Sequence, residues 1–139
     1  MKDRRDLVIG WLRKADSDLD VLELAINANT ALDTACFHAQ QAAEKLFKAF
    51  LLERQLQFPF THDLTRLLRL CQAQDNSFAI LFPSTEPLTP YAVELRYDGE
   101  FWPSVEVAVE AREAALAIRR FVLEGPPSDI QDELNQATS

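Results

Sequence analysis

The chain has 139 residues and a formal net charge of −8 at pH 7, and 47% of its residues are hydrophobic. This composition excludes an intrinsically disordered chain, and the length predicts one domain around one hydrophobic core. The excess of acidic residues argues against a general nucleic-acid-binding protein, because such proteins gain affinity by neutralising phosphates.

Apolar residues recur at helical spacing along the chain and glycine is scarce, which together predict an all-α protein. The expected segments are helices at about 4–27 and 35–55, a helix capped by Thr61, a short apolar segment at 78–82, and helices at about 86–96 and 104–123. We therefore expect an up-and-down helical bundle of four long helices plus a short helix. Because Gly125 and two prolines stop the last helix, the bundle is expected over residues 1–125 and an acidic, disordered tail over residues 126–139.

The second expected helix has two different faces. Its apolar face holds Ala39, Ala43, Leu46 and Phe50, and its polar face holds Thr34, His38, Gln41, Glu44, Lys45 and Lys48. Two interpretations of the polar face stay open. It is either a solvated surface with an ion pair between Glu44 and Lys48, which physics alone favours, or a ligand-binding surface. For His38, Gln41 and Lys45, hydrogen bonds across helices are favoured over ligand binding.

The last expected helix is apolar on two sides, since Val105, Val109 and Leu116 lie nearly opposite its main stripe. A helix of this kind is either central in a bundle or shared with another subunit. The pattern therefore predicts a homodimer.

Cysteine and histidine are few, which limits the chemistry. Cys36 and Cys71 fall on expected helices in a chain without an export signal, so we expect free buried thiols and a cytoplasmic protein. The two histidines, His38 and His62, have no suitably spaced carboxylate partners, so neither a metal site nor a cofactor is expected. No apolar run approaches the roughly 20 residues of a membrane span, so no membrane partner is expected.

Three short motifs occur in a particular order along the chain. They are Ala35-Cys-Phe-His-Ala-Gln-Gln-Ala-Ala-Glu-Lys-Leu-Phe-Lys-Ala49, then Thr61-His-Asp-Leu64, then Leu95-Arg-Tyr97. Together they resemble the HEPN domain (higher eukaryotes and prokaryotes nucleotide-binding), and the Gln-Gln-Ala-Ala-Glu-Lys core is the most specific of them. The resemblance covers about residues 5–123.

The resemblance implies a helical bundle that pairs as a dimer. Many HEPN domains accompany a minimal nucleotidyltransferase, often as a toxin–antitoxin pair, and others are metal-independent ribonucleases with an R-x4-6-H motif. No histidine follows His62 here, so that motif is absent and no enzyme is expected. The resemblance therefore favours a nucleotide-binding partner module. A ribonuclease that uses Arg96, Tyr97 and His62 and a purely structural homodimer remain the alternatives, and binding of RNA is left open.

The candidate ligand-binding residues follow from the same motifs. Arg96 is expected to hold an anionic ligand, because it ends a helix at a fixed turn and a planar guanidinium suits phosphate. Tyr97 and His62 are expected close by, with Lys45 and Gln41 at the edge of the site. The helix start at His62 would add backbone N–H donors.

Overall fold

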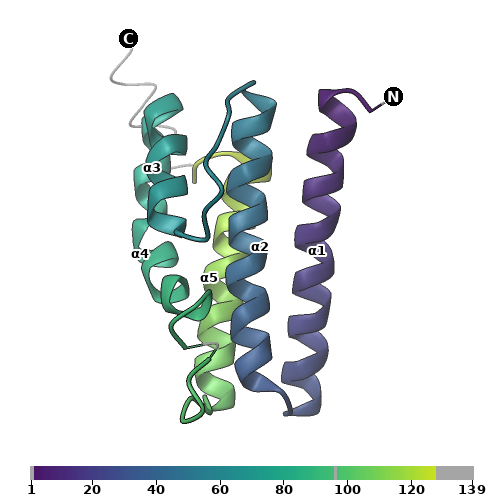
Figure 1. The fold of residues 1–139 in the computed structure, drawn as a ribbon, viewed down its shortest axis with the longest axis vertical. Coiled ribbons are helices and arrows are strands. Elements are labelled where there is room, and N and C mark those ends of the chain that lie inside the picture. The colour runs from purple at the N-terminus through teal and green to yellow at the C-terminus, as the bar shows by residue number, and fades with distance from the viewer. Residues whose placement is uncertain (1, 96, 128–139) are drawn as a thin grey trace.

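Every regular element that the structure describes is helical. The structure is a computed structural model that describes residues 2–95 and 97–127, so Arg96 and most of the expected tail (residues 128–139) lie outside the described residues. The helices (Figure 1) are α1 (Arg4–Ala28), α2 (Leu32–Glu53), α3 (Leu64–Gln74), α4 (Phe82–Thr85) and α5 (Val105–Glu124), with the 3-10 helices η1 (Asn76–Leu81) and η2 (Glu86–Tyr91). The predicted all-α bundle is confirmed. None of the described helices is both long and apolar enough to cross a membrane.

Helix α2 is the central element of the bundle. It contacts α1, α3 and α5, and it lies between α1 and the α3–α4 side in Figure 1. Its small side chains let the neighbouring helices approach closely, and four alanines on it are fully buried: Ala35, Ala39, Ala42 and Ala43. The ion pair expected on its polar face between Glu44 and Lys48 is present at 3.0 Å. The solvated surface expected around this pair is wrong, because Glu44 and Lys48 are buried at 4% and 8% exposure.

The ends of the first and last helices follow sequence rules. Asp3 caps α1 in a reciprocal capping box with Asp6, in which each side chain accepts the other residue's backbone N–H. Ser104 caps α5 by accepting from the backbone N–H of Val107. Gly125 ends α5 with φ of 91°, a value that favours glycine.

The N-cap of α3 is Asp63, not the expected Thr61. The carboxylate of Asp63 accepts from the backbone N–H of Arg66 at 3.3 Å. Thr61 acts two residues earlier, where its hydroxyl accepts from the backbone N–H of Asp63 at 3.0 Å. The cap therefore shifts because an Asp, one of the strongest capping residues, follows the Thr closely.

The prediction of an α-helix at residues 86–96 is wrong, because its first part is a 3-10 helix. Residues 86–91 form the 3-10 helix η2, and residues 92–95 form turns. Pro90 explains the difference, because it has no N–H and its ring would clash with the carbonyl four residues earlier in an α-helix. The expected short segment at 78–82 is helical and spans the end of η1 and the start of α4.

Two ion pairs join α5 to α1. Arg112 lies 2.8 Å from Glu23, and Arg119 lies 2.7 Å from Asp16.

The second apolar side of α5 is partly covered within the chain, since Val105, Val109 and Leu116 are all half-buried. The homodimer therefore stays a prediction, and these three residues are not the most exposed apolar side chains of the molecule.

The predicted free, buried thiols are confirmed for both Cys36 and Cys71. Burial raises the pKa of Cys36 to about 11 and that of Cys71 to about 12, because a thiolate is poorly solvated inside the bundle. Both thiols therefore stay protonated at neutral pH and act as small apolar side chains of the core.

Candidate functional site

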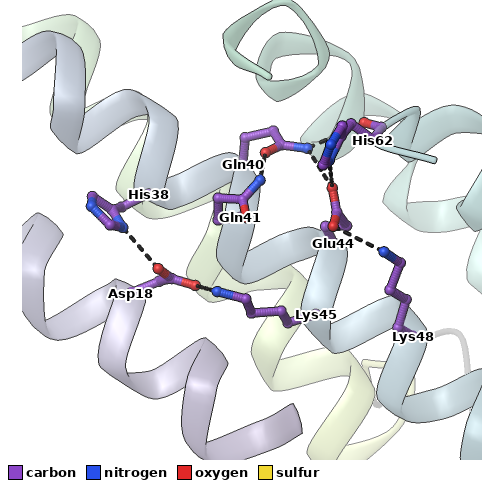
Figure 2. Close-up of polar contacts among 8 residues, drawn as sticks. All are labelled: Asp18, His38, Gln40, Gln41, Glu44, Lys45, Lys48 and His62. Carbon is purple, nitrogen blue, oxygen red and sulfur yellow. Dashed lines mark hydrogen bonds and ion pairs between the residues drawn. The ribbon is translucent and has the colours of Figure 1, made fainter. Parts of the chain in front are cut away.

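A buried carboxylate, Glu44 of α2, is the centre of a polar cluster. One of its oxygens accepts from Gln40 Nε2 at 3.3 Å and lies 2.8 Å from His62 Nδ1, and the other lies 3.0 Å from Lys48 Nζ (Figure 2). Because a carboxylate only accepts, His62 carries its proton on Nδ1 in this contact. The three donors compensate the burial of the charge.

Lys48 is the cation of this cluster, and aromatic rings complete its surroundings. Its ammonium lies 5.7 Å from the ring centroids of both Trp11 and Phe58. Trp11 comes from α1 and Phe58 from the linker before α3, and the two rings also contact each other edge to face. The buried cation is thus stabilised by one carboxylate and two π-systems.

The same cluster holds the linker between α2 and α3 in place. Gln40 donates from Nε2 to the backbone carbonyl of His62 at 3.2 Å, while the ring of His62 contacts Glu44. Two of the three short motifs therefore meet in space, because Gln40 and Glu44 belong to the first and His62 to the second. These motif residues therefore have a structural role, because their contacts hold the linker against α2.

A second buried carboxylate, Asp18 of α1, lies on the other flank of α2. Its two oxygens lie 2.7 Å from His38 Nδ1 and 2.5 Å from Lys45 Nζ (Figure 2). Gln41 donates to Gln40 at 2.7 Å. The expectation of hydrogen bonds across helices is therefore confirmed for His38 and Lys45. It is wrong for Gln41, whose partner Gln40 is on the same helix.

A surface cavity of about 760 Å³ lies beside His62, whose side chain is 62% exposed. Apolar groups and three carboxylates line it: Phe60, Thr61, His62, Asp63, Thr65, Glu86, Thr89, Pro90, Ala92, Val93 and Glu94. Phe60 is fully exposed at this cavity. The arrangement offers a flat apolar ring, hydrogen-bond acceptors and one imidazole to a ligand.

The predicted ligand-binding residues are not all brought together. His62 lines the cavity, whereas Lys45 and Gln41 do not and make their contacts with Asp18 and Gln40. Tyr97 is 75% exposed and is not among the lining residues. Arg96 lies outside the described residues, so its role stays a prediction.

Two arginines that the motifs did not point to lie next to this cavity. Arg66 and Arg69 line a depression of about 390 Å³ that shares Asp63 and Thr65 with the cavity. Both are exposed, and neither forms an ion pair with a described residue. Their spacing of three on α3 places both on one face, which is the signal in the sequence that would have found them. Over residues 2–95 and 97–127, no group of three or more His, Cys, Asp or Glu side chains is placed to hold a metal ion.

Comparison with known proteins decides the family. A sequence model of the HEPN domain matches residues 8–125 of the chain. The chain belongs to the HEPN family. Two solved structures are similar to this HEPN chain. ST0689, an archaeal HEPN homologue, is 24% identical, with a TM-score of 0.68 over 88% of this chain and 96% of its own. TT1696 from Thermus thermophilus is 26% identical, with a TM-score of 0.72 over 85% of this chain and 97% of its own. No curated protein matches the chain.

Proposed function

We propose that this HEPN protein is a homodimeric, nucleotide-binding partner module that acts with a minimal nucleotidyltransferase in the cytoplasm, as one half of a toxin–antitoxin type pair. The observation that carries the nucleotide part is the cavity at His62, which continues into the depression at Arg66 and Arg69. Membership of the HEPN family supports the partner role.

The chemistry of the cavity suits the base and ribose of a nucleotide. The ring of Phe60 is fully exposed and offers a surface on which a base stacks. The carboxylates of Glu86 and Glu94 accept hydrogen bonds from amino and hydroxyl groups. These same carboxylates repel phosphate, so the phosphate chain is expected outside the cavity.

The neighbouring depression suits the phosphates. Arg66 and Arg69 provide two guanidinium groups without carboxylate partners among the described residues. A guanidinium binds phosphate through paired hydrogen bonds, and the Arg96 of the third motif is proposed to add to this charge. A single nucleotide is favoured over a long RNA, because the protein as a whole is acidic.

The ribonuclease alternative has one observation in its favour. Glu44 holds Nδ1 of His62 at 2.8 Å, and the imidazole is otherwise exposed at the cavity. A histidine oriented by a carboxylate is a typical arrangement for acid–base catalysis. Against it, the R-x4-6-H motif of the family's ribonucleases is absent, because no histidine follows His62.

Replacing both arginines is expected to weaken the binding of ATP by at least about tenfold, because each charged hydrogen bond contributes roughly 1.5–3 kcal/mol. The measurement is calorimetric titration of ATP and AMP into the wild type, Arg66→Ala/Arg69→Ala and Arg96→Ala. Arg120→Ala is the matched control, since Arg120 is an exposed arginine on α5 that lines a different depression. Equal affinities of the wild type and the double variant would show that these arginines do not bind the nucleotide.

An RNA-cleavage assay tests the ribonuclease alternative. If the wild type cleaves RNA and the His62→Ala variant does not, the ribonuclease is favoured.

The partner role predicts that a reading frame next to this one encodes a minimal nucleotidyltransferase, and co-expression of the two proteins tests whether they bind. The proposal predicts that a tagged HEPN chain retains the nucleotidyltransferase through gel filtration. Elution of the two proteins in separate peaks contradicts the partner role. It does not affect the proposed nucleotide binding, which the titration tests separately.

A further inference from the structure

An exposed seam runs along the outer side of α1. Its positions are spaced alternately by three and four residues, and all seven are exposed: Leu7, Gly10, Lys14, Ser17, Val21, Leu24 and Ala28. We call these residues the outer seam. Spacing of this kind places side chains in one line along a helix and is typical of the contact line of a coiled coil.

No described part of the chain covers the outer seam. Helix α1 is at the edge of the bundle (Figure 1). Its buried side chains, such as Ala15 and Leu22, belong to the core. The seam nevertheless holds three exposed large apolar side chains: Leu7 at 44%, Val21 at 39% and Leu24 at 69%. An aligned set of exposed apolar side chains is typical of an interaction surface.

We propose that the outer seam pairs with the outer seam of a second copy, in antiparallel orientation. The two ends of the seam are then complementary, because Leu7 packs against the partner's Leu24. Gly10 faces the partner's Val21, and the Gly10 position is open, with no atom within 4 Å of a side chain placed there. In the centre Lys14 faces the partner's Ser17, and such a polar layer helps to fix the register of a helix pair.

The charges beside the seam select this orientation and register. Arg13 and Asp20 flank the seam on its solvent side, are exposed, and form no ion pair with a described residue. In the proposed register Arg13 lies opposite the partner's Asp20, and the two-fold symmetry repeats the pair. Sliding one helix by seven residues instead brings Arg13 against the partner's Arg13, or Asp20 against the partner's Asp20. Like charges in these flanking positions oppose pairing.

This inference rests on the homodimer of the proposed function and names its surface. The cavity at His62 lies across α2 from the outer seam, on the side of α3 and η2. Pairing through α1 therefore leaves the cavity open. Mass measurements test the seam, whereas the nucleotide titration tests the cavity, so the two proposals fail independently.

The first experiment places charge in the seam. The double variant Val21→Glu/Leu24→Glu is expected to be a folded monomer, because both side chains are exposed in the single chain. Ile9→Glu is the matched control, since Ile9 is an apolar residue of α1 with 37% exposure that is not part of the seam. Sedimentation velocity gives the mass and circular dichroism the helix content. A monomeric wild type, or a double variant that keeps the wild-type dimer mass, overturns the proposal.

The second experiment tests the register by exchanging charges. Arg13→Asp alone and Asp20→Arg alone each replace two attractive pairs by two repulsive ones, which should weaken dimerisation about tenfold. An equimolar mixture of these two variants restores both attractive pairs between unlike chains, so it should dimerise about as tightly as the wild type. If the mixture is as weak as its components, the antiparallel register is wrong.

Discussion

The variant Glu44→Leu is expected to lower the free energy of unfolding by about 3–5 kcal/mol, the usual cost of removing one partner of a buried ion pair. The side chains of Glu44 and Lys48 are only 5% and 10% exposed. Without the carboxylate, the Lys48 ammonium keeps its two aromatic neighbours but loses its ion-pair partner. His62 Nδ1 also loses its acceptor and Gln40 loses one of its two acceptors, which adds to the cost. Urea unfolding followed by circular dichroism measures the change.

Two further variants separate the ion pair from a general effect of lost charge. Glu53→Leu is the matched control, because Glu53 lies on the same helix with a side chain that is 61% exposed, and a change within about 0.5 kcal/mol is expected. The double variant Glu44→Leu/Lys48→Met removes both charges and should recover most of the loss. A Glu44→Leu protein as stable as the control would mean that water reaches the Lys48 ammonium.

The fold was predictable wherever neighbouring residues decide the structure. The apolar spacing, the scarcity of glycine and the stop signal at Gly125 place the long helices close to their observed ends. The failure at 86–96 has a local cause that was present in the sequence. A proline is compatible with the first turn of an α-helix but not with its interior. In a helix that begins at residue 86, Pro90 lies beyond the first turn, so the sequence already argued against an α-helix here.

The candidate site was less predictable, because its contacts join residues far apart in the chain. The polar face of α2 looks like a solvated surface in the sequence, since nothing local shows that Trp11 and Phe58 cover Lys48. Likewise, the partner of Lys45 is Asp18, 27 residues away on α1. A helical wheel assigns each residue to a face, but only the packing of the other helices decides whether that face meets water.

Phe78→Ala is expected to cost about 3–5 kcal/mol of the free energy of unfolding, as truncation of a buried phenylalanine usually does. Phe78 of η1 is 2% exposed, and its ring centroid lies 4.4 Å from that of Phe50 on α2 and 4.8 Å from that of Phe121 on α5. Its removal leaves a cavity where three elements meet, and it also removes two aromatic contacts, each of which contributes about 0.5–1.5 kcal/mol beyond burial.

Phe60→Ala is the matched control for this substitution. The chemical change is identical, but Phe60 is fully exposed, so the free energy of unfolding should change by no more than about 0.5 kcal/mol. Thermal and urea unfolding of both variants give the comparison. The pair also separates stability from binding, because Phe60 lines the cavity at His62 while Phe78 does not. If Phe78→Ala unfolds like the wild type, η1 does not pack on α2 and α5 as the structure places it.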